Sequence, residues 1–478
     1  MTDPQHENGG AFPTLTLLPR SVWRGIRWLW RKTWRFSIAL LILLIIAHII
    51  FNFTAGRRLE AELARIRGAG DPLTVSEVAP PPVPDSENAA LVYQQAFEGL
   101  PADEDNEIIA DFISLPEHGE YPRPTLAQVE EILAAHEKEL QLLEEASLMP
   151  AARFPVKWEV GFAAIFPHLA KMRGATRLLC AKALAEAHRG HSGEALESLA
   201  VIVRMGNHAA TEPTIVAQLV RAAMMGILFA SLPEILATAP PTAAESRAFY
   251  DLLDEVDVIN PYVTAMKTER CNGLWAFDLV RRDGVFSAIQ EIHQRLPRAA
   301  ERALTRAWPV IRPVWEPLLK LDKIRYLQTM AQIVKLSHKT YAQSRDDYPQ
   351  LKEQPQQVWY APVSSMLSPV YPRLHGKRDG LLAELRVAQA ALALRAYQIE
   401  HGEYPDSLEQ IGERWEIEKD PFTGKPLVYQ RVGDGYFIYS LGPDLTDNKG
   451  IDLRTARQGK AGIPSTEFTY DIPLRMSR

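Results

Sequence analysis

The densest group of potential metal ligands lies near the C-terminus, in the loop 442–452. This loop carries three carboxylates, Asp444, Asp447 and Asp452, and the side-chain amide of Asn448. Hard oxygen ligands of this kind suit calcium, although their register is not that of an EF-hand. The same residue types also cap solvated turns by accepting backbone hydrogen bonds. Both interpretations stay open, and the plain turn is the one we favour.

The remaining reactive side chains predict no catalytic set. His188 and His191 lie three residues apart near an expected helix end and lack further metal ligands. Glu269 beside Arg270 is explained by an ion pair at a helix end. Acidic neighbours such as Asp254 are expected on solvated helix faces, where nothing shifts their pKa. Phosphate-loop, zinc-protease and dinucleotide fingerprints are absent from the sequence.

The stretch that must position everything else is apolar and near the N-terminus. Residues 36–53, FSIALLILLIIAHIIFNF, carry no full charge, and their only polar residues are Ser37, His48 and Asn52. As a helix they span roughly 27 Å, close to the hydrocarbon thickness of a bilayer. A core helix would show a polar face, and a cleaved signal peptide would have a shorter apolar region. The stretch therefore predicts a single transmembrane helix.

The flanks of this helix predict its direction. Four tryptophans interleaved with cations precede it, as in interfacial segments that lie against anionic cytoplasmic lipid. Residues 1–35 carry a net charge of +4, and because the whole chain carries −6, the remaining residues carry about −10. Arginines also follow the helix, but Glu60 and Glu62 dilute them. We expect a cytoplasmic N-terminus, an extracytoplasmic body in the cell membrane, and no nucleic-acid partner.

The rest of the chain reads mainly as helices. Leu169–His188 and Gly193–Ala210 are joined by a short glycine-containing connection, which predicts an αα-hairpin. Cys180 and Cys271 could pair, but in a chain of this size buried and reduced thiols are expected. The expected divisions are a basic cytoplasmic tail at 1–35, a transmembrane helix at 36–53, a stalk and proline-rich spacer at 54–85, a helical domain at 86–345, a linker at 346–376, and an α+β domain at 377–478.

The final part contains short alternating segments around Gly433-Asp434-Gly435, which predict a β-hairpin. About 70 residues here resemble the globular domain of the major pseudopilins of type II secretion systems. The motifs that carry the resemblance are Ala391, Leu392 and Tyr397, then Gly402, Tyr404 and Pro405, then Asp420-Pro421-Phe422-Thr423-Gly424, then Pro426, Leu427 and Tyr429, and finally Tyr439-Ser440-Leu441-Gly442-Pro443-Asp444.

In that family the loop after the last of these motifs binds calcium. The resemblance implies that the carbonyls of Ser440 and Leu441, with the carboxylates of Asp444, Asp447 and Asp452, would be the ligands. A pseudopilin begins with a processing site and an apolar helix that carries a glutamate. This chain has an apolar helix but neither the processing site nor the glutamate, so we do not expect it to polymerise. The overall layout also resembles large membrane-anchored proteins of planctomycete-type bacteria.

The sequence thus predicts a mainly α protein with one transmembrane helix, a large body of αα-hairpins and a small pseudopilin-like α+β domain. The function we expect is that of an envelope scaffold or interaction protein with a protein partner in the envelope. Two alternatives stay open. One is an extracytoplasmic enzyme whose site is assembled from scattered residues, and the other is a divergent component of a type II secretion system.

Overall fold

The computed structural model describes residues 20–114, 123–284, 298–347, 361–367, 371–412, 415–450 and 472–476. Within these ranges the chain is mainly helical and closes with a small antiparallel sheet of three strands. The elements up to the middle of the chain are α1 (Arg20–Gly68), α2 (Val75–Val78), η1 (Asp85–Glu87), α3 (Ala89–Glu98), α4 (Asp103–Ile113), α5 (Leu126–Ala135), α6 (Glu137–Ser147), η2 (Trp158–Ala163), α7 (Pro167–His188), α8 (Ser192–Ala210), α9 (Ile215–Thr238) and α10 (Ala243–Asp254).

The elements of the second half follow in the same direction. They are α11 (Ile259–Asp283), α13 (Arg298–Ser337), α14 (Tyr341–Ser344), α16 (Pro362–Leu367), α17 (Tyr371–His401), η4 (Leu408–Ile411), β1 (Val428–Val432), β2 (Gly435–Ser440) and β3 (Ile472–Met476). The part of the predicted cytoplasmic tail before Arg20 lies outside the described residues.

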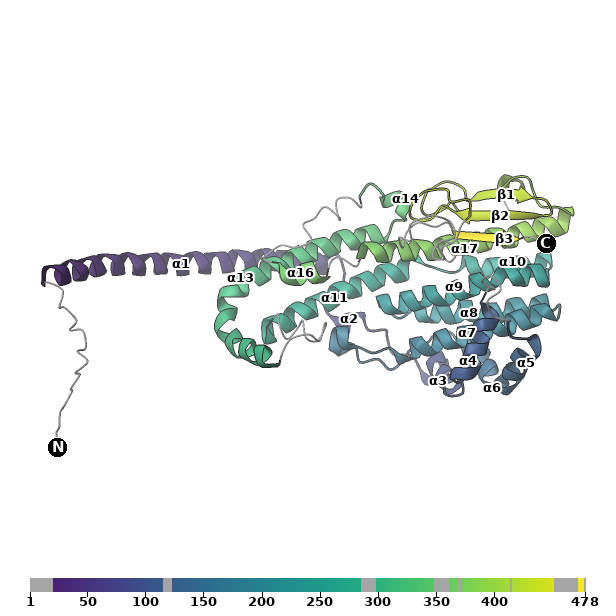
Figure 1. The fold of residues 1–478 in the computed structure, drawn as a ribbon, viewed down its shortest axis with the longest axis horizontal. Helices are drawn as coiled ribbons and strands as arrows, with labels where there is room; N and C mark the ends of the chain where they lie inside the picture. Colours follow the sequence, from purple (N-terminus) through teal and green to yellow (C-terminus); the bar gives the residue numbers. More distant parts are fainter. Residues whose placement is uncertain are drawn as a thin grey trace, which may run out of the picture.

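The N-terminal apolar stretch is part of a single helix, α1, that is 49 residues long. Its first half projects from the body, and its second half lies along α13 (Figure 1). Large side chains from Trp34 to Phe53 are exposed. Leu59, Leu63 and Ile66 instead pack against the body. The predicted stalk at 54–85 therefore does not stand free, because its apolar side chains are covered by α11 and α13.

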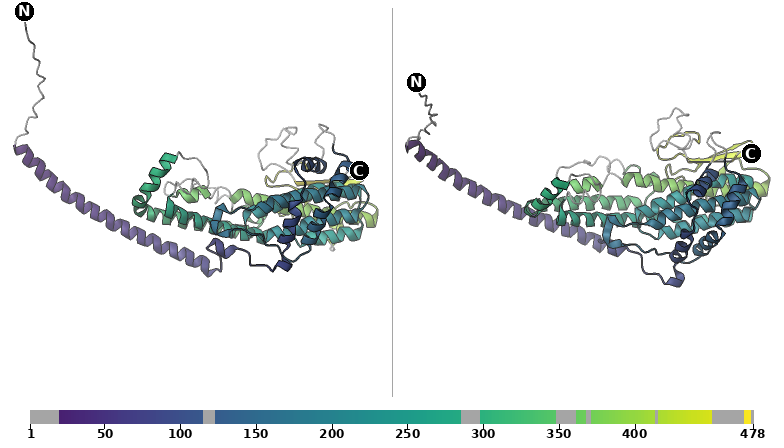
Figure 2. Two further views of the ribbon diagram at one scale, coloured as in Figure 1. Left: turned by 90° about the horizontal axis from the view of Figure 1, so that it is seen from below. Right: turned by 60° about the horizontal axis from the view of Figure 1, so that its bottom comes forward.

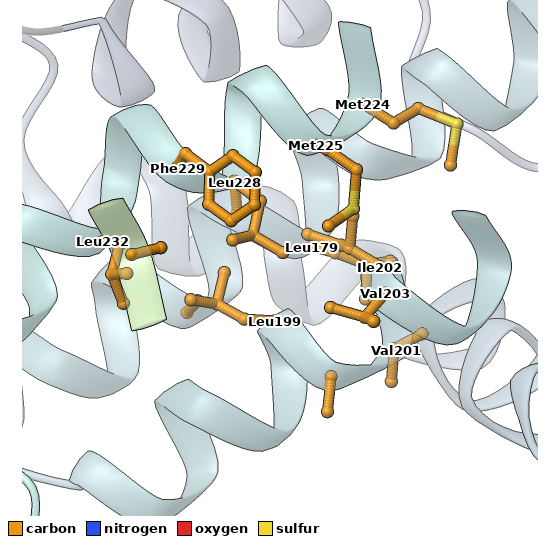
Figure 3. Close-up of a cluster of buried hydrophobic side chains, with 14 of the residues drawn as sticks. Leu179, Leu199, Val201, Ile202, Val203, Met224, Met225, Leu228, Phe229 and Leu232 are labelled. Carbon is orange, nitrogen blue, oxygen red and sulfur yellow. The ribbon is translucent and has the colours of Figure 1, made fainter. Parts of the chain in front are cut away.

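The body is built around α7, α8 and α9, which pack against one another, with α8 antiparallel to both neighbours as the short connections predict. Figure 3 shows the side chains between them, a set dominated by leucine, valine and methionine. Alanines such as Ala181 and Ala200 are also fully or nearly buried, which lets the helices approach closely. Although α9 is apolar enough to cross a membrane, half of its apolar window is buried, as expected for a core helix.

The C-terminal part shares this core. Helix α17 packs against α10 and α9, and Leu392 and Ile438 belong to the same buried cluster as Leu179. β1 and β2 form the predicted hairpin, with Val432 opposite Gly435, and β3 adds a third antiparallel strand. The division expected at 346–376 thus does not separate two hydrophobic cores. The α+β character is as predicted, whereas the likeness to a pseudopilin remains an expectation.

A second layer is formed by α11 and α13, which meet at a glycine. The ring of Tyr326 lies against Gly273, and its hydroxyl donates a hydrogen bond of 2.8 Å to the carbonyl of Glu269. A Cβ atom at position 273 would come within 2.1 Å of the Tyr326 side chain. The close approach of these two helices therefore requires the missing side chain.

We predict that Gly273→Ala lowers the free energy of unfolding by about 1–3 kcal/mol, because a rigid buried ring must move. Gly380→Ala is the matched control, since Gly380 is also helical and a Cβ atom at that position would meet no other atom within 4 Å. It should raise stability by about 0.5–1 kcal/mol through helix propensity. Thermal unfolding of the detergent-solubilised full-length protein measures both, and equal stability of the two variants would contradict the prediction.

Candidate functional site

The apolar helix and the body meet through a proline-rich segment of α13. Pro309, Pro313 and Pro317 all lie within this helix. A proline has no N–H, so the carbonyl four residues earlier loses its helical partner. The carbonyl of Pro313 is in this position because residue 317 is a proline. His48 of α1 lies 2.9 Å from it through Nε2 and donates the hydrogen bond that the helix cannot supply.

A second polar contact lies one turn further along α1. The ammonium group of Lys320 donates to Oδ1 of Asn52 over 2.7 Å. Further on, Gln328 donates to Glu62 over 3.3 Å, and Leu59 and Ile66 contact the body between and beyond these polar pairs. Two of the three polar residues of the apolar stretch, His48 and Asn52, thus form hydrogen bonds with α13.

Sequence reasoning did not find this contact, although a signal is present in the sequence. His48, Asn52, Ala55, Leu59, Leu63 and Ile66 recur at intervals of three or four residues. That spacing places them on one face of a helix. The apolar character of the surrounding residues hid the stripe, because Leu and Ile fill the other faces up to Phe53.

At the other end of the body, a buried aspartate joins the two C-terminal motifs. Oδ1 of Asp420 accepts hydrogen bonds from the Phe422 amide and the Ser440 hydroxyl, both at 2.9 Å. Its Oδ2 accepts from the Thr423 hydroxyl at 3.2 Å and from the Leu441 amide at 3.3 Å. The carboxylate therefore fixes the turn at 420–424 to the end of β2.

The predicted calcium loop begins where this network ends. Asp444 accepts from the amide of Thr446 and the side chain of Asn448, both at 3.2 Å. Oδ1 of Asp447 accepts from the Tyr439 hydroxyl at 3.0 Å and the Lys449 amide at 2.8 Å. In the described part of the loop, both carboxylates cap the turn, which is the arrangement expected of the plain-turn alternative.

The Ser440 side chain donates to Asp420, which leaves the Ser440 carbonyl as the implied ligand. Asp452 lies outside the described residues. Among the described residues, no three His, Cys, Asp or Glu side chains come close enough together to hold a metal ion. Calcium binding by the complete set, with Leu441, Asp444 and Asp447, stays a prediction.

An assembled catalytic site would need acids whose pKa is shifted toward neutrality. Among the described residues, burial raises the pKa of three carboxyl groups. Burial raises the pKa of Glu269 on α11 to about 7 and that of Asp379 on α17 to about 6. Burial also raises the pKa of Asp322 on α13. The two aspartates have structural partners: Asp379 accepts from Arg378 and from the Tyr341 amide, and Asp322 accepts from the amides at the start of α16.

A small cavity lies between α9, α11 and α17, and none of the three acids lines it. Its volume is about 20 Å³, enough for one water molecule, and its lining includes Arg221, Tyr262, Lys377 and Arg378. Arg221 donates to the carbonyl of Asp257 at 2.7 Å, so its charge is already held by the body. The cavity is too small for an organic substrate. Both cysteines, Cys180 and Cys271, are buried and unpaired.

We predict that Asp420→Asn lowers the free energy of unfolding by about 1–3 kcal/mol. Either orientation of the amide turns its NH₂ group toward a backbone N–H, that of Phe422 or that of Leu441. Asp434→Asn is the control, because Asp434 is exposed in the hairpin turn and should leave stability unchanged. Urea unfolding of the full-length protein in detergent compares them, and an unchanged midpoint for the Asp420 variant would be evidence against the network.

A second prediction concerns the pH dependence of stability. The pKa of Glu269 is about 7 when folded, against 4.5 as its ordinary value, so the folded state binds the proton more tightly. Stability should therefore fall as pH rises from about 4.5 to about 7, by about 3 kcal/mol from this group. Glu269→Gln removes this component, and its unfolding free energy should change less between pH 5 and pH 8. Parallel pH profiles for the two proteins would contradict the assignment.

Comparison with known proteins adds no relative from which a site could be transferred. Neither the family models nor the curated proteins nor the solved structures contain a match to this chain. Among the described contacts, those that α1 makes with α13 and with Leu274 of α11 join the apolar helix to the body.

Proposed function

We propose that the protein is a single-pass membrane protein that presents its helical body outside the cytoplasm as a scaffold for protein contacts in the bacterial envelope. The observation that supports this most directly is the exposure of α1. Residues 36–53 present large apolar side chains on nearly every face of the helix, and none of these residues is buried in the protein. A helix of this kind needs a bilayer around it.

The energy of insertion supports a stable anchor. The stretch contains thirteen Leu, Ile and Phe residues. At about 0.3–0.6 kcal/mol each, these contribute roughly 4–8 kcal/mol toward membrane insertion. The direction follows from the net charge of +4 before residue 36, because cations are retained on the cytoplasmic side.

The scaffold role is inferred from the construction of the body. The αα-hairpins, α17 and the sheet share one buried cluster, so the body is a single unit that can transmit a fixed geometry to a partner. Its shifted acids are spread over α11, α13 and α17 rather than gathered in one cleft, which favours an interaction role over catalysis.

The test uses single cysteines in the full-length chain and a membrane-impermeant maleimide on intact spheroplasts. The native thiols are fully buried, so the introduced ones dominate labelling. Asp434→Cys, in the exposed hairpin turn, should be labelled in intact spheroplasts. Thr2→Cys, in the N-terminal tail, should be labelled only after the membrane is permeabilised.

The reverse pattern would place the body inside the cell and overturn the proposal, as would recovery of the protein in the soluble fraction. The scaffold role adds a second requirement. Photo-crosslinking from the exposed surface of the body in native membranes should give a discrete adduct with one envelope protein, and adducts that contain only copies of this chain would contradict it.

A further inference from the structure

A short apolar face lies on α13 close to the exposed half of α1. The side chains of Val310 and Val314 are 79% and 69% exposed, and that of Ile311 is 42% exposed. Positions i, i+1 and i+4 share one side of a helix, so the three side chains form a contiguous face. We call these three residues the α13 patch. The described part of the body leaves this patch uncovered.

The hydrogen bond between His48 and Pro313 shows which part of α1 lies level with the patch. Pro313 immediately precedes Val314, and His48 lies five residues before Phe53, the last apolar residue of the stretch. Five residues of helix correspond to about 8 Å. Amphipathic segments in a membrane interface bury their apolar side by about 5–10 Å. The patch therefore lies at interfacial depth when α1 spans the bilayer.

The residues around the patch have the chemistry of a membrane interface. Trp308 is half-buried and donates through Nε1 to the carbonyl of Arg281 over 3.2 Å. Arg282 at the end of α11 and Arg312 within α13 are exposed. Tryptophan is enriched at the headgroup level, and arginine can keep its charge in water while its stem lies along apolar surface.

The direction of the chain at this point is also suitable. Figure 1 shows α13 turning across the direction of α1 at the end of the body from which the free part of α1 projects, and Figure 2 shows the same end from two other sides. Helix α13 contains three prolines, and proline bends a helix by removing hydrogen bonds. A segment that crosses the direction of the anchor would lie along the plane of the membrane.

We propose that the α13 patch inserts into the extracytoplasmic interface of the bilayer that α1 spans, so that lipid covers it. This proposal rests on the proposed function, since it requires α1 to be the anchor. The protein then has two membrane contacts that are held together by the hydrogen bonds of His48 and Asn52. Two contacts prevent the body from rotating freely about α1 and fix which side of it faces away from the membrane.

The experiment measures lipid contact directly. Val310→Cys and Val314→Cys in the full-length chain are labelled with an environment-sensitive dye and reconstituted in vesicles of phosphatidylethanolamine and phosphatidylglycerol. Nitroxide groups on the lipid acyl chains should reduce the fluorescence at both positions at least about twofold, as expected for side chains at the acyl boundary. Circular dichroism melts check that each variant folds.

Two control positions separate the failure of this proposal from the failure of the anchor. Leu43→Cys lies in the middle of the apolar stretch and should be quenched. Val432→Cys is also an exposed apolar position, but it lies on the hairpin at the far end of the body and should not be quenched.

Quenching at position 43 without quenching at 310 and 314 would overturn the insertion of the patch and leave the anchor intact. Absence of quenching at position 43 would overturn both. A third outcome is a blue-shifted dye at 310 that lipid nitroxides do not quench, together with disulfide-linked dimers of the Val310→Cys protein. That result would assign the patch to a second copy of the chain and would overturn its insertion into lipid.

Discussion

The structure depends on α1 being one uninterrupted helix. Its apolar stretch is exposed, and its C-terminal part packs against the body. A helix satisfies all of its own interior backbone hydrogen bonds, so it can leave an apolar environment and join a protein core without exposing polar groups. From Thr33 to Ala47 its side chains are exposed, and from Ala55 to Ile66 one face is covered by the body. The body therefore begins directly on the apolar helix rather than at the end of a flexible connection.

The contact with α1 accounts for one of the three prolines in the 40-residue helix α13. A proline inside a helix costs about 3 kcal/mol, partly because a carbonyl is left without its donor. In α13 one such carbonyl, that of Pro313, receives a hydrogen bond from His48. His48 in turn would be a polar group in an apolar stretch with no partner of its own. The hydrogen bond gives both His48 and the carbonyl of Pro313 a partner, so neither polar group is left unpaired.

Much of the helical architecture could be predicted from local patterns. The apolar helix, the hairpin of α7 and α8 and the turn at Gly433 follow from hydrophobic spacing and from glycine positions. Pairings between distant segments could not, because nothing local specifies them. The addition of β3 to the sheet, the packing of α17 on α9 and α10, and the contact between His48 and Pro313 all join residues that are far apart in the sequence. The spacing of the carboxylates in the loop does not by itself distinguish a metal ligand from a turn cap, because both roles use the same residue types.

The buried charges complete the physical description of the body. Arg378 donates to the carbonyls of Ser337 and Lys339 at the end of α13, over 2.7 and 2.6 Å, and pairs with Asp379. The C-terminal end of α13 is thus held by α17, while its proline-rich part is held by α1. Since α17 belongs to the main core, α13 connects that core to the apolar helix through charge-assisted hydrogen bonds at one end and a proline-freed carbonyl at the other.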